Sequence, residues 1–341
     1  MIRSFRIQDA SLVSALQAKG TYLDLRRAAL WPNDLLSAAM RVYWPFSRQS
    51  VRTLVIRETI NGSQLNGFVQ YLESHNAPEA DIVFCSPAIE GSERARHRQL
   101  TWQKLLGQLV VSAGERGVQR VYARVVDGAP ELEVFWQMGF SAYARERVYV
   151  RSERPTKGKP QRARLWKPQR AKLWKPQRSR DIRGVGQLYT AVTPKLVQQA
   201  ENLPRSDYLT PYRDSFGRGV DRRFVWNDGD GVCASLRLIQ GRAGTWLKLI
   251  THSRVFDRVD ELLADALRLV PAGVTRIYVS VREYQSELEG AILAAGFAWK
   301  ATEMLMVKHT TVMVKKRVLK KLPVMEGIEV RPTATSTRMQ R

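Results

Sequence analysis

The chain has 341 residues, 44% of them hydrophobic, so it can bury a substantial core, and its length favours two domains over one. Lysine and arginine outnumber aspartate and glutamate by 55 to 32, which predicts a positive surface that attracts polyanions. Cys85 and Cys233 are too few for a disulfide framework, and the amino terminus lacks an apolar core of signal-peptide length. We therefore expect a reduced, cytoplasmic protein that does not interact with membranes.

The first half of the chain begins with a strand pattern at 3–7, followed by a helix that Asp9, a residue type favoured at helix N-caps, would begin. Helical or irregular sequence continues to about residue 44. Strand patterns then occupy 53–57, 67–73 and 81–86, with Asn61-Gly62 as a turn between the first two. The remaining elements expected are an amphipathic helix at 98–116, a strand at 118–125, a helix at 130–138 and a strand at 143–150.

A basic segment follows, with an eight-residue repeat that starts with Lys-Pro-Gln-Arg at 159, 167 and 175. Residues 151–183 contain thirteen basic and two acidic residues, with Trp166 and Trp174 among them. Cations beside aromatic rings on an extended chain suit phosphate contacts and base stacking. A plainer interpretation is a slipped duplication of a strand at 174–180, in which Pro176 is tolerated only at a sheet edge.

The second half has strand patterns at 224–227, 232–239 and 246–250, a helix from about 257, a strand at 274–280, a helix from 286 and a strand to about 308. Antiparallel strands followed by helix–strand–helix–strand predict an α/β fold in each half, with a mixed, mostly antiparallel sheet flanked by helices. We divide the chain into a domain at 1–150, a basic linker at 151–173, a domain at 174–310 and a basic tail at 311–341.

The two halves repeat one another. Residues 117–125 (GVQRVYARV) return 156 positions later as 273–281 (GVTRIYVSV), and Glu-Leu-Glu at 131–133 returns at 287–289. At an offset of 157, Gly139-Phe140 returns as Gly296-Phe297 and residues 146–150 return as 303–307. The apolar stripe that begins at Trp102 is repeated, in the same steps, from Val259. The halves are therefore interpreted as duplicated copies of one unit.

This order of elements resembles the GNAT N-acetyltransferase fold. The resemblance rests on the paired leucines at 105–106 and 262–263 and on Gly117 and Gly273. It also rests on residues 135–140 (FWQMGF) and on the corresponding segment of the second half, which ends in Gly296-Phe297. It covers nearly the whole chain as two tandem copies. It implies a V-shaped opening in the sheet that takes acetyl-CoA, transfer of the acetyl group to an amine, and an oxyanion held by a backbone N–H of the splayed strand near Phe84, Cys85 and Ser86.

The resemblance also places a Q/R-x-x-G-x-G/A loop, which holds the coenzyme pyrophosphate, at the start of the central helix, where small residues let backbone N–H groups approach phosphate. Counting back from the paired leucines puts this loop at 97–102 and at 254–259. Its glycine positions hold Leu100 and Trp102 in the first copy and Asp257 and Val259 in the second. The residues left to bind the coenzyme, besides 84–86, are His97, Arg98, Gln99, Thr101, Arg254 and Arg258.

The sequence assigns no catalytic residue. The tyrosine acid that many family members place four residues before the glycine of the Gly-Phe pair is replaced by Phe135 and Ile292. The histidines do not have metal-ligand spacing, so no metal site is expected. Cys85 is predicted to be a small buried hydrophobic residue.

The leading hypothesis is a tandem GNAT-like N-acetyltransferase that uses acetyl-CoA and acts on a small-molecule or peptide amine. The alternative is a non-catalytic binding protein, which holds nucleic acid or another polyanion through residues 151–183. A third hypothesis, a tandem transferase that uses aminoacyl-tRNA, would reconcile the positive charge with the loss of the coenzyme glycines.

Overall fold

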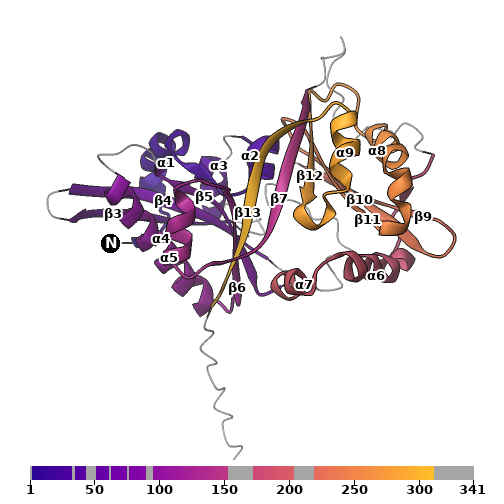
Figure 1. Cartoon of the computed structure of the whole chain (residues 1–341). Helices are drawn as coiled ribbons and strands as arrows, with labels where there is room; N and C mark the ends of the chain where they lie inside the picture. Colours follow the sequence, from indigo (N-terminus) through magenta and orange to yellow (C-terminus); the bar gives the residue numbers. More distant parts are fainter. Residues whose placement is uncertain are drawn as a thin grey trace, which may run out of the picture.

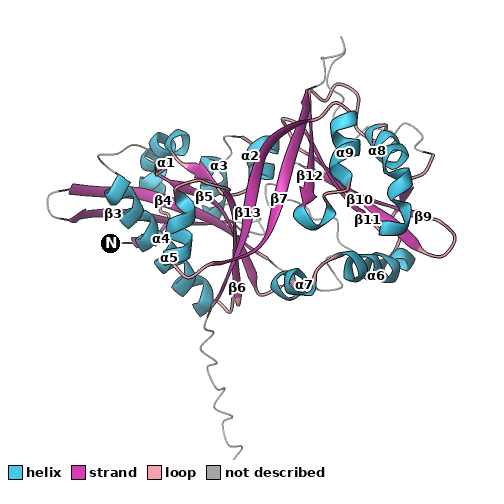
Figure 2. Cartoon of the chain, in the orientation of Figure 1, coloured by secondary structure: helices cyan, strands magenta, loops and turns pink. Residues whose placement is uncertain are grey.

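The computed structural model describes residues 2–32, 35–43, 51–60, 63–74, 77–89, 95–152, 172–202 and 219–310. Through these ranges runs one continuous sheet, and helices cover both of its faces (Figure 1, Figure 2). In the same ranges, no helix combines the length and the apolar character that crossing a membrane requires.

The strands of the first half are β1 (Ile2–Ser4), β2 (Thr21–Tyr22), β3 (Val51–Ile60), β4 (Ser63–Glu73), β5 (Glu79–Ser86), β6 (Arg120–Val126) and β7 (Ser141–Ser152). Its helices are α1 (Ala10–Leu16), α2 (Leu25–Leu30), α3 (Leu35–Met40), α4 (Ala95–Glu115) and α5 (Glu131–Gln137). The second half contains strands β8 (Lys175–Pro176), β9 (Val220–Asn227), β10 (Val232–Gln240), β11 (Thr245–Thr251), β12 (Arg276–Arg282) and β13 (Ala298–His309), and helices α6 (Ile182–Val192), α7 (Lys195–Glu201), α8 (Val259–Leu267) and α9 (Leu288–Ala294). The predicted α/β class, a mixed and mostly antiparallel sheet flanked by helices, is confirmed.

The strand order shows how the two copies join. It is β1-β3-β4-β5-β6-β13-β7-β12-β11-β10-β9-β8, and β2 pairs with β5. The final strand of each copy therefore lies between strands of both copies, since β13 pairs with β6 and β7, and β7 pairs with β13 and β12. The segment predicted as a domain at 1–150 thus shares its sheet with the second copy.

An approximate two-fold axis relates the copies. Glu146 on β7 is the register partner of Glu303 on β13, which is the residue that the sequence repeat matches to it. The axis therefore passes between these two glutamates. The backbone repeats as well, because Gly117 and Gly273 have φ angles of +88° and +83°, a left-handed conformation that glycine adopts at little cost.

The edges of the sheet agree with the sequence prediction. The short strands β1 and β8 lie at opposite ends of the strand order, as expected for the first strand of each copy. Pro176 is tolerated because β8 pairs with β9 alone among the described strands.

Asp9 lies at the predicted N-cap position of α1, but its side chain does not cap that helix. Its carboxylate accepts no hydrogen bond from a backbone N–H of α1 and instead accepts from Arg3 at 2.6 and 2.9 Å and from the backbone N–H of Arg6 at 2.9 Å. The side chain is fully buried, and a buried carboxylate is stable only when cations and several donors surround it.

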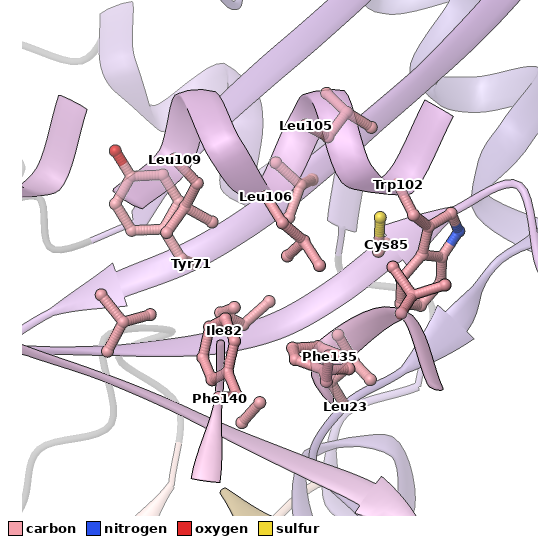
Figure 3. Packing of buried hydrophobic residues seen from close by; sticks show 14 of the residues in the cluster. Leu23, Tyr71, Ile82, Cys85, Trp102, Leu105, Leu106, Leu109, Phe135 and Phe140 are labelled. Atoms are coloured by element: carbon pink, nitrogen blue, oxygen red, sulfur yellow. The ribbon is translucent and has the colours of Figure 1, made fainter. Parts of the chain in front are cut away.

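The predicted apolar stripe of α4 forms the core of the first copy. Trp102, Leu105, Leu106 and Leu109 are fully buried, and Figure 3 shows them next to Cys85 and Ile82 of β5. Helices α1 and α3 pack on the other face of β3, β4 and β5. In the second copy α8 and α9 take the places of α4 and α5. Both cysteines are free and buried.

Three predicted features fall outside the described residues. They are the Asn61-Gly62 turn, residues 153–171 of the basic linker, and the tail at 311–341.

Candidate functional site

Within the described strands, two neighbouring parallel strands of each copy separate from one another, and we call this opening a fork. In the first copy, the parallel strands β5 and β6 pair only from Glu79–Arg120 to Asp81–Tyr122 and then separate. This first fork lies between residues 82–86 of β5 and 123–126 of β6. It is the V-shaped opening that the sequence resemblance implied, and it contains the predicted residues Phe84, Cys85 and Ser86.

The first fork is filled by the chain itself. Strand β2 pairs with β5 through Thr21–Cys85 and Tyr22–Phe84. The next residue, Leu23, joins both arms: its N–H donates to the Val83 carbonyl at 2.9 Å, and its carbonyl accepts from the Arg124 N–H at 3.2 Å. The Leu23 side chain is fully buried in the core that contains Trp102. The edge of β5 next to the fork therefore already has backbone partners.

Close contacts hold this segment in place. A Cβ atom at Gly20 would lie 2.3 Å from the Phe84 ring and 2.7 Å from the Cys85 carbonyl, so only glycine allows this approach. The Thr21 hydroxyl donates to the buried Glu131 of α5 at 2.7 Å.

The predicted residues of the first loop lie at the start of α4. The Arg98 guanidinium donates to the Ala88 carbonyl at 3.0 Å, and the Thr101 hydroxyl donates to the His97 carbonyl at 2.8 Å. His97 is exposed, and Gln99 is half-buried. Trp102, at the second glycine position, is fully buried, and its indole N–H donates to the Pro87 carbonyl at 2.6 Å. An indole thus occupies the place where the family has a small residue.

The second fork has a different edge. Strands β11 and β12 pair from Thr245–Ile277 to Lys248–Ser280 and then separate. Residues 249–251 of β11 correspond to 84–86 of β5, and on the side of the fork no described strand pairs with them. The Thr251 side chain is 1% exposed, and its hydroxyl has no hydrogen-bond partner among the described residues.

The predicted arginines of the second loop are held at the surface by carboxylates. Arg254 pairs with Asp228 at 3.0 Å, and Arg258 pairs with Glu261 at 2.9 Å and stacks over the Trp226 ring at 4.9 Å. This loop forms a 3-10 turn (Ser253–Arg258) that leads into α8. Its two glycine positions hold an exposed aspartate and the buried Val259. The predicted residues of the first copy thus lie on β5 and at the start of α4, and those of the second copy lie in the turn that precedes α8.

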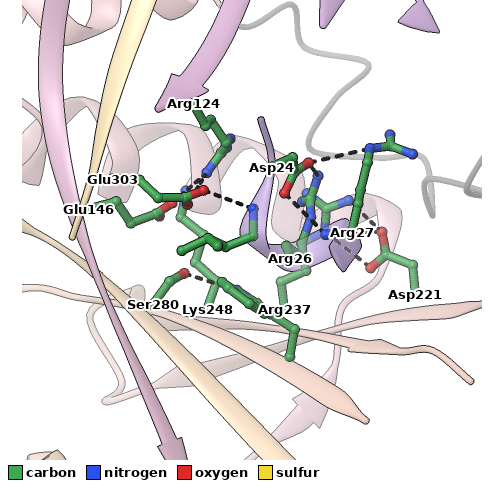
Figure 4. A network of polar contacts seen from close by, with 12 residues as sticks. Asp24, Arg26, Arg27, Arg124, Glu146, Asp221, Arg237, Lys248, Ser280 and Glu303 are labelled. Carbon is green, nitrogen blue, oxygen red and sulfur yellow. Dashed lines mark hydrogen bonds and ion pairs between the residues drawn. The ribbon is translucent and has the colours of Figure 1, made fainter. Parts of the chain in front are cut away.

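Beside the second fork, at the two-fold axis, lies a network of charged side chains (Figure 4). Glu146 accepts from Arg124 at 2.5 Å, pairs with Arg282 at 3.2 Å and lies 3.9 Å from the Lys248 ammonium. Arg282 also pairs with Glu201 of α7 at 2.7 Å. Glu146 and Arg282 are 1% and 3% exposed, so these charges are stabilised mainly by one another.

The two related glutamates have opposite pKa shifts. Burial alone would raise the pKa of Glu146, but its three cations outweigh burial and hold that pKa well below its usual range. For Glu303, burial prevails and raises the pKa to about 7. Arg124 lowers this pKa, whereas the negative charges of Asp24 and Glu146 raise it further. One Glu303 oxygen accepts from the Leu25 N–H at 2.8 Å, and the other has no hydrogen-bond partner among the described residues.

Lys248 is an amine of this network whose pKa is shifted from its usual value. Burial, together with the neighbouring Arg282, lowers the pKa of Lys248 to about 8, although Glu146 and Glu201 oppose the shift. Its side chain retains 30% exposure. An amine with this pKa is partly neutral near neutral pH and can act as a nucleophile or a base.

Sequence reasoning missed the central network. A signal existed, because the repeat matched Glu146 to Glu303. The pairing of β7 with β13, which brings the two together, has no local signature. In the described ranges, no group of histidine, cysteine and acidic side chains could hold a metal ion.

No protein-family model matches the sequence, and no curated protein matches it. Solved structures do match. A GCN5-related N-acetyltransferase from Sphaerobacter thermophilus is 12% identical, with 91% of this chain and 95% of that chain covered and a TM-score of 0.46. A tandem GNAT protein from the clavulanic acid biosynthesis pathway is 11% identical, with 91% and 98% covered and a TM-score of 0.46.

A functionally unknown conserved protein from Staphylococcus epidermidis is 9% identical, with 75% of this chain and 95% of that chain covered and a TM-score of 0.48. The order of the elements and the fork in each copy give the chain the tandem GNAT-like fold predicted from its sequence.

Proposed function

We propose that the protein is a GNAT-like N-acyltransferase that binds an acyl thioester, such as acetyl-CoA, in the second fork only. The supporting observation is the contrast between the two strand edges. In the first fork, Thr21–Tyr22 and Leu23 use the backbone groups of β5 that the thioester arm would need. In the second fork, residues 249–251 of β11 have no such strand partner among the described residues.

The second copy suits the pantetheine arm of acetyl-CoA better than its pyrophosphate. The free strand edge suits the extended pantetheine arm, because a strand edge presents backbone donors and acceptors in a row. The pyrophosphate end lacks the glycine cradle, and the exposed Asp257 places a carboxylate near the expected phosphate position. The proposal therefore assigns most of the binding free energy to the arm and the acyl group.

When bound, acetyl-CoA supplies a thioester whose carbonyl a neutral amine can attack directly. The contribution of this chain is orientation by the edge of β11, and a backbone N–H of that edge holds the developing oxyanion. The amine acceptor is a small molecule, a peptide or, as argued below, a residue of the chain itself.

Calorimetric titration with acetyl-CoA tests this proposal through a matched pair of variants. Asp257→Gly removes the carboxylate at the first glycine position of the second loop, and we expect it to tighten binding about 5- to 10-fold. Leu100→Gly introduces glycine at the equivalent position of the first copy. Because the first fork is filled, we expect this substitution to leave the affinity for acetyl-CoA unchanged. Absence of binding to both the native chain and Asp257→Gly, or tightening by Leu100→Gly alone, would overturn the proposal.

The alternative of a non-catalytic protein that holds a polyanion through residues 151–183 stays a prediction, because most of that segment lies outside the described residues.

A further inference from the structure

Lys248 lies at the apex of the second fork. It is the last residue of β11 in register with β12, where its partner is Ser280, and the strands separate directly after it. Its neighbours Leu247 and Leu249 point into the core beneath α8, so the lysine side chain leaves the sheet on the opposite face.

The ammonium group reaches over the opening of the fork. Strand β12 lies between β11 and β7, yet Lys248 Nζ is 3.9 Å from Glu146 on β7. Glu146 is the register partner of Arg282, two residues beyond Ser280 in the direction in which the fork opens. The Lys248 side chain therefore leans across β12 and over the start of the fork.

We propose that Lys248 is an acylation site of the protein, modified by the thioester that binds in the second fork. This inference rests on the proposed function, because that fork supplies the acyl donor. Nζ attacks the thioester carbonyl carbon, a C–N bond forms and the C–S bond breaks. The thiolate leaves and is protonated by the proton that the amine gives up, so the products are an amide on Lys248 and a free thiol.

The surrounding charges accommodate the modification. Acylation removes the positive charge of Lys248, but Glu146 keeps its two closer partners, Arg124 at 2.5 Å and Arg282 at 3.2 Å. The groups that face the ammonium are Glu146 on β7, Arg282 on β12, Arg124 on β6 and Glu201 on α7. An internal amine also agrees with the absence of a tyrosine acid at positions 135 and 292, since a single turnover does not require rapid release of the thiol.

The chain offers a matched control. Lys104 is 31% exposed, against 30% for Lys248, and it also forms an ion pair, with Glu58 at 2.6 Å. It lies on α4, and its partner Glu58 belongs to β3, a strand that borders neither fork. Lys104 therefore reports the labelling that exposure alone allows. Because the lowered pKa of Lys248 by itself favours attack on any thioester, the need for a held donor is tested by comparing acetyl-CoA with a small thioester that lacks the pantetheine arm.

The experiment is incubation of the full chain with acetyl-CoA, followed by peptide mass spectrometry over time. We expect Lys248 to be acetylated at least about tenfold faster than Lys104, with a rate that rises up to about pH 8 and then levels off. Lys248→Arg should abolish this modification and still bind acetyl-CoA by calorimetry, and Lys104→Arg should leave it unchanged.

Binding of acetyl-CoA with equal labelling of Lys248 and Lys104 would overturn the inference and leave the proposed function intact. Absence of both binding and labelling would overturn both. Labelling of Lys248 that persists at the same rate after excess acetyl-CoA is replaced by a small thioester without the pantetheine arm would also contradict it, since the held donor would then be unnecessary.

Discussion

Glu146 and Glu303 are the same residue of the repeated unit, yet the structure gives them different environments. Glu146 is surrounded by Arg124, Arg282 and Lys248. Glu303 accepts one hydrogen bond, from the Leu25 N–H, and lies 3.9 Å from the Arg124 guanidinium. Two carboxylates directly opposite one another on paired strands repel, and this repulsion is relieved when one of them takes up a proton.

The raised pKa of Glu303 predicts a pH-dependent stability. Its folded pKa of about 7 lies above the usual 4.5, so the folded chain keeps a proton that the unfolded chain releases between these values. The contribution of Glu303 is therefore fully present below about pH 4.5 and is lost as the pH rises through 7. We expect Glu303→Gln to raise the free energy of unfolding by about 2–3 kcal/mol near pH 8 and to change it little near pH 4.5, as measured by urea unfolding.

Glu146→Gln provides the opposite case at the matched position. Removing this carboxylate leaves three buried or half-buried cations without their shared partner, so we expect a loss of about 3 kcal/mol in the free energy of unfolding at neutral pH. Equal effects of the two substitutions would show that the different environments have no energetic consequence, and the assignment of the proton to Glu303 would then be wrong.

At the scale of elements, β2 is the shortest of the described strands of the first copy, and it determines what the first fork can hold. Its two residues and the following Leu23 connect the arms of the fork, and Gly20 brings them close to Phe84. Gly20 has ordinary extended angles, with φ −121° and ψ 176°, so the requirement for glycine is steric and does not depend on a special backbone conformation.

Gly20→Ala therefore tests the filled fork. The new Cβ atom would lie within 2.7 Å of the Cys85 carbonyl, which is backbone and cannot rotate away. We expect the free energy of unfolding to fall by about 1–3 kcal/mol in urea unfolding. The control is Gly186→Ala in α6, where nothing lies within 4 Å of the new atom and where we expect a gain of about 0.5–1 kcal/mol. A stable Gly20→Ala variant would mean that β2 can move away from β5.

The sequence predicted the long elements well and missed β2. The stripe of α4, which includes Trp102 and Leu105, repeats with the helical period, and the strands from β3 to β7 alternate or run apolar over several residues. These patterns are local and can be read directly. Thr21–Tyr22 is too short to have a period, and its partner β5 lies about sixty residues away, so no local signal indicated that it would fill the fork.

At the scale of the whole molecule, the sequence established the duplication but did not reveal how the copies join. The match of residues 146–150 with 303–307 is equally compatible with two separate sheets and with one shared sheet. The choice depends on pairing between β7 and β13, and antiparallel pairing leaves the apolar pattern of each strand unchanged. The network around Glu146 was missed for the same reason, because its members come from β6, β7, β11 and β12.

The shared sheet predicts that the two copies stay together when the chain is cut. Strand β7 is hydrogen-bonded on one side to β12 and on the other to β13, and both partners belong to the second copy. Separation would expose the backbone groups along both edges of β7 and the charges around Glu146, at a large cost in free energy.

Cleavage at a protease site introduced within residues 157–168 would measure this. We expect the two fragments to elute together in size-exclusion chromatography, with the elution volume of the uncut chain, and to separate only in denaturant. Salt of about 1 M, which shortens the Debye length to about 3 Å, should not separate them, because the strand ladders and the buried ion pairs are poorly screened. Two fragments that elute as separate folded monomers would contradict the shared sheet, in which β7 pairs with β12 and β13, and β13 pairs with β6. Neither copy would then depend on the final strand of the other.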